Sequence, residues 1–142
     1  MRALLDVNVL IALLDSDHAS HHVAIQWFAA NAGIGWSSCP ITQIGCVRIM
    51  SHPGYPNAHA VHEVVARLRE ATAATVHSFW ADDVSLLDAQ LIDSTRVHGP
   101  RQSTAVYLLA LAVKHGGRLV TFDQSIARAA VRGASAAQLV VL

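Results

Sequence analysis

The chain has 142 residues, of which 53% are hydrophobic and only 14% are charged. This balance excludes an intrinsically disordered protein, which needs low hydrophobicity and a high net charge, and the length favours one domain over residues 1–142. Ten basic and ten acidic residues cancel, so no overall field attracts the chain to nucleic acid or to a membrane surface. Because few charged residues must cover the surface, we expect a large apolar interface.

The apolar pattern alternates along the chain between short strand-like runs and the three-to-four-residue spacing of helices. Strands are predicted over residues 2–5, 36–39, 75–80, 118–122 and 138–142. Helices are predicted over residues 9–14, 19–32, 40–50, 58–74, 84–92 and 105–114, with one more short helix after Asp123. This alternation predicts an α/β fold, a three-layer α/β/α sandwich with a mainly parallel central sheet.

Capping residues set the predicted boundaries of the later helices. Asp82 and Asp83 are expected to cap the helix over 84–92, because short polar side chains accept hydrogen bonds from the first free N–H groups of a helix. Ser103 or Thr104 is expected to cap the long apolar helix that follows. Both predictions rest on residue type and position alone.

The two cysteines and the ends of the apolar runs indicate a compartment. Cys39 and Cys46 are seven positions apart, about 10 Å on one helix, which is too far for a disulfide. We expect buried thiols in a reducing compartment. An acid at Asp6 argues against a signal peptide, and no apolar run is long enough to span a membrane. These features predict a cytoplasmic protein that does not engage a membrane.

Two acids directly follow predicted strands and are the first candidates for a functional site. Asp6 follows the strand over 2–5, and Asp123 follows the strand over 118–122. Ligands of parallel sheets bind beyond the carboxyl ends of the strands, so the two carboxylates converge if the first and fourth strands are neighbours. The alternative is that each acid only caps the helix after it.

Converging carboxylates repel each other and need a cation. Oxygen ligands favour a hard ion, Mg²⁺ or Mn²⁺, and such an ion activates water and neutralises phosphate, so phosphodiester hydrolysis is the chemistry that this site predicts. An aspartate-based phosphotransferase fits less well, because its Asp-x-Asp motif needs an acid where Asn8 stands.

Several separated segments, in order, resemble those of PIN-domain ribonucleases. They cover nearly the whole chain, and the resemblance is greatest to the VapC toxins of type II toxin–antitoxin modules. The segments are LLDVNVLIAL at residues 4–13, residues 18–27, GWSSCPITQIGCVR at 35–48, TAVYLLALA at 104–112 and LVTFD at 119–123. The resemblance implies the PIN-like sandwich and a Mg²⁺- or Mn²⁺-dependent endoribonuclease that cuts structured RNA such as tRNA or rRNA. It also implies a homodimer inhibited by a VapB-like antitoxin.

The resemblance also implies which residues form the site. Asp6 and Asp123 match the first and last acids of the family and are expected to hold the metal. Asn8 matches the polar residue beside the first acid, and Thr121 is expected to support the last one. Gln43 falls where many PIN domains have Glu, and it is expected to contribute to the hydrogen-bonding shell of the site.

Ala105 departs from the family pattern, which has a helix-borne Asp at this position. An alanine cannot ligate a metal, so we expect weakened Mg²⁺ binding and impaired catalysis in this chain. Two explanations are open: an engineered inactive variant, or a natural relative with lost or weakened catalysis. The alternative function is an inactive homologue that binds an antitoxin or RNA. Asp88 and Asp93 are possible sources of a replacement oxygen, although exposure to solvent is the favoured interpretation of both.

Overall fold

Five short strands form one fully parallel sheet in the order β3-β2-β1-β4-β5 in the computed structural model, which describes residues 1–142. The strands are β1 (Ala3–Leu5), β2 (Trp36–Ser38), β3 (His77–Phe79), β4 (Arg118–Thr121) and β5 (Leu139–Val141). The α-helices are α1 (Val7–Leu14), α2 (His21–Asn31), α3 (Pro40–Met50), α4 (Val61–Thr72) and α5 (Ser103–Lys114). The predicted α/β sandwich with a parallel sheet is confirmed.

Strand β1 lies at the centre of the sheet, between β2 and β4. Its residues pair in register with β4, and Leu5 lies opposite Val120. The first and fourth strands are therefore neighbours, as the convergence of the two acids requires. Because both strands run in the same direction, the residues that follow them emerge at the same edge of the sheet.

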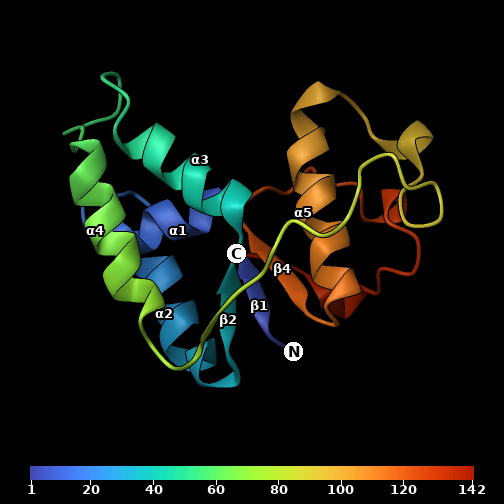
Figure 1. The fold of residues 1–142 in the computed structure, drawn as a ribbon, viewed down its shortest axis with the longest axis horizontal. Coiled ribbons are helices and arrows are strands. Elements are labelled where there is room, and N and C mark those ends of the chain that lie inside the picture. The colour runs from blue at the N-terminus through green and yellow to red at the C-terminus, as the bar shows by residue number, and fades with distance from the viewer.

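The helices cover the sheet from two sides. Figure 1 shows α1 to α4 on one side and α5, with the C-terminal part of the chain, on the other. Successive side chains of a strand point to opposite faces. Accordingly, Leu4 and Leu119 pack in the cluster with α5, whereas Leu5 and Val120 pack in the cluster with α1, α3 and α4. The two apolar clusters fix the positions of the strand ends.

Most predicted elements are confirmed with ends that differ by one to three residues. Pro40 occupies the first turn of α3, where its missing N–H group leaves no helical bond unmade. Helix α5 begins at Ser103 without a side-chain cap, so Ser103 and Thr104 lie in its first turn and the predicted cap is wrong. A single 3₁₀ turn, Pro100–Gln102, leads the chain into α5.

The predicted helix over 84–92 is wrong, and so are its proposed caps, Asp82 and Asp83. Short polar side chains bind the backbone locally here and compete with helical hydrogen bonds. Ser85 Oγ accepts from the Leu87 N–H at 3.1 Å, and Asp88 Oδ1 accepts from the Gln90 N–H at 2.9 Å. Leu87, within this segment, is 90% exposed. The segment is tied to the fold through its backbone instead, as where the Tyr107 hydroxyl donates to the carbonyl of Val84.

The short helix expected after Asp123 is likewise reduced to one 3₁₀ turn, Arg128–Ala130. The cysteines are as predicted: Cys39 and Cys46 are free and buried. Burial raises the pKa of Cys39 to about 11 and that of Cys46 to about 12, so both thiols stay protonated near neutral pH. None of the helices combines the length and the apolar character that crossing a bilayer requires.

Candidate active site

Asp6 occupies the junction between β1 and α1. Its backbone is extended and its side chain caps α1, with Oδ1 accepting from the Val7 N–H at 2.7 Å. Oδ2 accepts from the Thr121 hydroxyl on the neighbouring strand β4, also at 2.7 Å. Asp6 does cap the following helix, as the alternative interpretation proposed, but its second oxygen is held by the adjacent strand. The carboxylate is therefore fixed from two elements.

The Thr121 hydroxyl joins the two predicted acids. It donates to Asp6 and accepts from the Asp123 N–H at 3.0 Å and from the Asn8 side-chain amide at 3.3 Å, which uses all of its hydrogen-bonding capacity. Asn8 in turn accepts the Phe122 N–H at 3.2 Å. One hydroxyl and one amide thus set the relative positions of the two strand ends.

Asp123 presents its carboxylate differently. Its Oδ1 accepts from both the N–H and the hydroxyl of Ser125, at 2.8 and 2.6 Å. The second oxygen, Oδ2, makes no hydrogen bond within the chain, and Asp123 lines the cleft described next. Ser125 was not singled out by the sequence, although a serine two residues after an aspartate is a common partner for its side chain.

Asp6 and Asp123 line one cleft of about 450 Å³ at the carboxyl edge of β1 and β4. Burial raises the pKa of Asp6, against the lowering effect of the bonds from Thr121 and Val7, and the negative charge of Asp123 raises it further. The charge of Asp123 therefore destabilises the charged form of Asp6. A cation between them would remove that repulsion.

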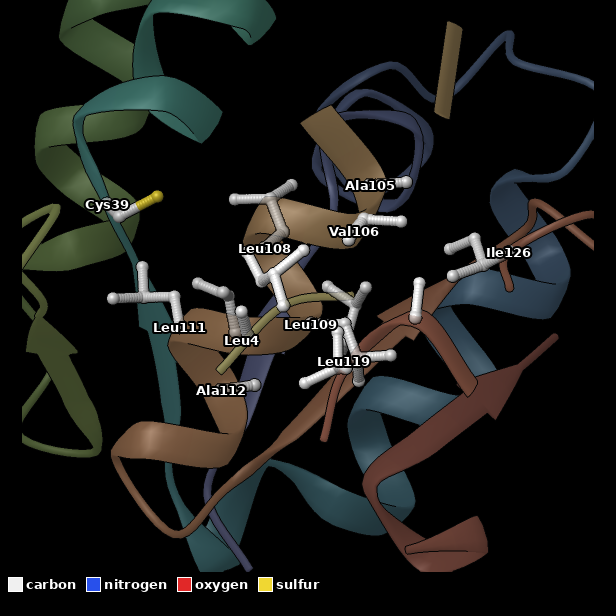
Figure 2. Close-up of a cluster of buried hydrophobic side chains, with 14 of the residues drawn as sticks. Leu4, Cys39, Ala105, Val106, Leu108, Leu109, Leu111, Ala112, Leu119 and Ile126 are labelled. Carbon is white, nitrogen blue, oxygen red and sulfur yellow. The ribbon is translucent and has the colours of Figure 1, made fainter. Parts of the chain in front are cut away.

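Ala105 lines the same cleft from the first turn of α5. Figure 2 shows it at the end of the apolar cluster that the buried leucines of α5 form with Leu4 and Leu119. Its side chain is 7% exposed. Helix α5 thus places residue 105 beside the cleft that the two acids line. An acidic side chain at this position would reach the cleft, whereas the methyl group of alanine supplies no oxygen.

Two arginine side chains also line the cleft. Arg48 extends from α3 and Arg101 from the 3₁₀ turn before α5, and both side chains are exposed. Arg48 forms no ion pair within the chain. Arg101 was not expected beside it. Residues 48 and 101 are brought together only by the tertiary fold.

Gln43 is not brought into this group. Its amide donates to Ser38 Oγ at 2.9 Å, at the end of β2, and Ser38 Oγ is 2.9 Å from Nε2 of His77. Gln43 is not among the residues that line the cleft, and its contribution to the hydrogen-bonding shell of the site stays a prediction. Asp88 and Asp93 also lie outside the lining, and Asp93 instead pairs with Arg96 at 3.3 Å.

The donor set fits a hard divalent cation only in part. The chain has no cluster of three or more His, Cys, Asp or Glu side chains placed to hold a metal. The two carboxylates of Asp6 and Asp123 are nevertheless sufficient in kind, since Mg²⁺ is commonly held by one or two carboxylates together with water and substrate phosphate. The site offers such an ion two carboxylates from the ends of the strands and no acidic side chain from α5.

Comparisons with known proteins agree with this fold. A PIN-domain family model matches residues 3–132. Ribonuclease VapC44 of Mycobacterium tuberculosis is 53% identical over 142 residues, covering 100% of both chains. Ribonuclease VapC39 of the same species is 42% identical over 134 residues, covering 94% of this chain and 96% of the relative.

Among solved structures, that of Mycobacterium tuberculosis VapC20, a sarcin–ricin loop cleaving toxin, has a TM-score of 0.64. The match covers 91% of this chain and 95% of that chain, at 13% sequence identity. At this identity the likeness shows a shared fold alone.

Proposed function

This chain belongs to the PIN-domain family and, within it, to the VapC ribonuclease toxins, and we propose that it is a divalent-metal-dependent endoribonuclease whose activity is severely impaired by Ala105. The observation that carries the proposal is the cleft in which Asp6, Asp123 and Ala105 meet. Two acids from two strands converge there, and the third position, on α5, is neutral.

Asp6 and Asp123 would hold the cation, Mg²⁺ or Mn²⁺. Such an ion, when bound, supplies charge neutralisation for the scissile phosphate and lowers the pKa of a water molecule. Thr121 and Asn8 are positioning residues that do not line the cleft. Thr121 binds the Asp6 carboxylate and the Asp123 N–H. Asn8 binds the Thr121 hydroxyl and the Phe122 N–H. Their bonds fix the carboxylates before substrate arrives, which avoids reorganisation during the reaction.

Ala105 weakens the proposed cation site in two ways. It contributes no oxygen ligand and it removes one negative charge from the site, and both effects lower cation affinity. It also leaves Asp6 and Asp123 without a partner on α5 to orient the attacking water. The fold does not depend on an acid at this position, because the apolar cluster around Leu108 and Leu109 packs α5 on the sheet.

The proposed substrate is structured RNA, tRNA or rRNA. The name of VapC44 is that of a ribonuclease, and VapC20 is described as a toxin that cleaves the sarcin–ricin loop. The family relationship further supports a VapB-like antitoxin as the protein partner. The base at which this chain would cut depends on the shape and charge of the cleft rather than on the acids.

We also propose that the chain forms a homodimer. Large apolar side chains are exposed on α3 and α4, among them Ile44 at 59% and Val61 at 56%, and exposed apolar patches of this kind are typical of interfaces. Light scattering at micromolar concentration is expected to give the mass of two chains. A monomer under these conditions would contradict the assignment.

Reversion of residue 105 tests the nuclease assignment directly. Ala105→Asp is expected to raise Mg²⁺-dependent cleavage of tRNA or rRNA by about 100-fold or more, a barrier change of about 2.7 kcal/mol, with EDTA abolishing the gain. The control must add the same charge away from the cleft without disturbing the fold. Ala110→Asp cannot serve, because Ala110 is buried in the core. Ala129→Asp, on an exposed turn, adds the same charge away from the cleft and is expected to leave cleavage unchanged.

The second candidate function is a non-catalytic module that keeps the fold and binds a VapB-like antitoxin or RNA. Ala105 is the observation that favours it, since two carboxylates alone are a weak cation site. The same reversion separates the two functions. A catalytically impaired ribonuclease regains cleavage in the Ala105→Asp variant, whereas a binding module with an otherwise altered cleft cleaves nothing in either form.

A further inference from the structure

We propose that Arg48 and Arg101 form a phosphate clamp at the mouth of the cleft, through which this chain holds RNA without a divalent cation. The class of ligand, RNA, rests on the proposed function, whereas the clamp itself rests on the positions and the charges of the residues around the cleft. The clamp would give this Ala105-bearing chain a binding mode that does not require the metal.

The two guanidinium groups are free to bind a ligand. Arg48 and Arg101 form no ion pair and no side-chain hydrogen bond within the chain. Most other arginines do bind the chain itself. Arg2, Arg67, Arg128 and Arg132 donate to backbone carbonyls, Arg118 binds the side chain of Asn31, and Arg96 pairs with Asp93.

The two arginines approach the cleft from different elements. Arg48 lies on α3, on one side of the sheet, and Arg101 lies in the turn that begins α5, on the other side. A guanidinium offers a planar pair of donors that matches two phosphate oxygens. Two guanidinium groups, one from each side of the sheet, can bind phosphates of a single RNA strand that crosses the cleft.

The charge of the cleft is what makes metal-free binding possible in this chain. With Ala105, the two carboxylates of Asp6 and Asp123 are balanced by the two guanidinium groups. An acid at residue 105 would leave the metal-free cleft net negative and repel phosphate. Ala105 thus weakens the cation site and, at the same time, removes an electrostatic barrier to RNA.

The surroundings of the arginines strengthen and extend this attraction. Apolar side chains of α3, Ile41, Ile44 and Ile49, line the same cleft, and low-dielectric walls focus the field of the charges. Arg48 also lines two neighbouring hollows along α3, one of which runs to His52 and Tyr55. An RNA strand that leaves the cleft on this side stays in contact with Arg48, so we expect Arg48 to contribute more than Arg101.

Fluorescence anisotropy with a labelled RNA hairpin in EDTA tests the clamp. Arg48→Gln and Arg101→Gln are each expected to weaken binding by about tenfold and to lower the slope of log affinity against log salt by about 1. Arg128→Gln is the matched control. Arg128 is an exposed arginine that lies outside the cleft and outside both neighbouring hollows, and its loss is expected to change affinity less than about twofold.

Ala105→Asp adds an independent arm to the experiment. It is expected to weaken RNA binding in EDTA several-fold and to make binding respond to added Mg²⁺. The proposal is overturned if Arg128→Gln weakens binding as much as Arg48→Gln, if Arg101→Gln has no effect, or if polyglutamate competes as well as unlabelled RNA. The last result would identify an acidic peptide as the preferred ligand.

Failure of the clamp and failure of the nuclease assignment give different results. If Ala105→Asp restores cleavage but neither arginine variant changes binding in EDTA, the nuclease stands and the clamp does not. If Ala105→Asp cleaves nothing but both arginine variants lose affinity, the clamp stands and the catalytic assignment does not. Thermal unfolding of each variant checks that the fold is intact.

Discussion

The floor of the cleft is formed by the ends of β1 and β4, which carry Asp6 and Asp123, and one wall is formed by the first turn of α5, which carries Ala105. The floor carries two acidic side chains and the α5 wall carries none. On the floor, a single hydroxyl at Thr121 holds the carboxylate of Asp6 and the backbone of Asp123. On the wall, Ala105 presents a methyl group and nothing else. The floor keeps two repelling carboxylates in fixed positions, and burial raises the pKa of one of them, an arrangement that lowers stability unless a ligand uses it.

The orienting scaffold and the ligand set are therefore separate features of the site. The scaffold is made by the register of β1 and β4 and by the bonds of Thr121 and Asn8. The ligand from the wall depends on one side chain of α5. Loss of that side chain leaves the scaffold intact, so the following changes should affect the floor and the wall very differently.

Removal of a floor acid is expected to have the largest effect. In the Ala105→Asp background, Asp123→Asn should lower Mg²⁺-dependent RNA cleavage by about 1,000-fold, because it returns the site to two acids and removes the carboxylate that faces the cleft. Asp88→Asn is the control, since Asp88 caps a local turn outside the cleft. Equal losses in the two variants would show that the floor has no special role.

Removal of the orienting hydroxyl is expected to have an intermediate effect. Thr121→Val in the Ala105→Asp background keeps the shape of the side chain but leaves Asp6 without its bond from β4. Cleavage should fall by about 10- to 100-fold, the usual effect of an outer partner of a metal ligand. Thr121→Ser restores a hydroxyl and should recover most of the activity. A Ser variant as impaired as the Val variant would indicate a packing role instead.

Neutralising Asp6 is expected to change stability in a way that depends on pH. Because burial raises the pKa of Asp6 in the folded state, the folded protein binds protons more tightly than the unfolded chain there, so stability falls as pH rises through this pKa. Asp6→Asn removes the charged form that burial disfavours, so its effect on the free energy of unfolding should be more favourable at pH 7 than at pH 4. Denaturant titrations at both pH values would reveal this difference. An effect independent of pH would have another cause.

A neutral oxygen on the wall is expected to have the smallest effect. Ala105→Asn supplies a carbonyl oxygen of nearly the same reach as Asp but adds no charge. Mg²⁺-dependent cleavage should rise by about threefold or less, because charge as well as ligand number sets the affinity for a hard cation. A gain equal to that of Ala105→Asp would show that the wall lacks an oxygen rather than a charge.

The strands were predictable from their apolar runs, and the two acids because the first and fourth runs each stop at a carboxylate and parallel strands end at one edge. The absence of a helix over 84–92 was not predictable from the apolar residues, because their spacing is helical. The side chains of Ser85 and Asp88 bind the local backbone there instead. The pairing of Arg48 with Arg101 and the bond of Gln43 to Ser38 depend on contacts between elements. No local pattern records such contacts.

The central claim is that the cleft is a cation site that lacks one acidic ligand from α5. Titration with Mn²⁺, followed by electron paramagnetic resonance, measures this directly in the original chain, in Ala105→Asp and in Asp6→Asn. We expect weak binding in the original chain, at least about tenfold tighter binding in Ala105→Asp, and none in Asp6→Asn. Equal affinity in the original chain and in Ala105→Asp, or binding that survives Asp6→Asn, would contradict the account.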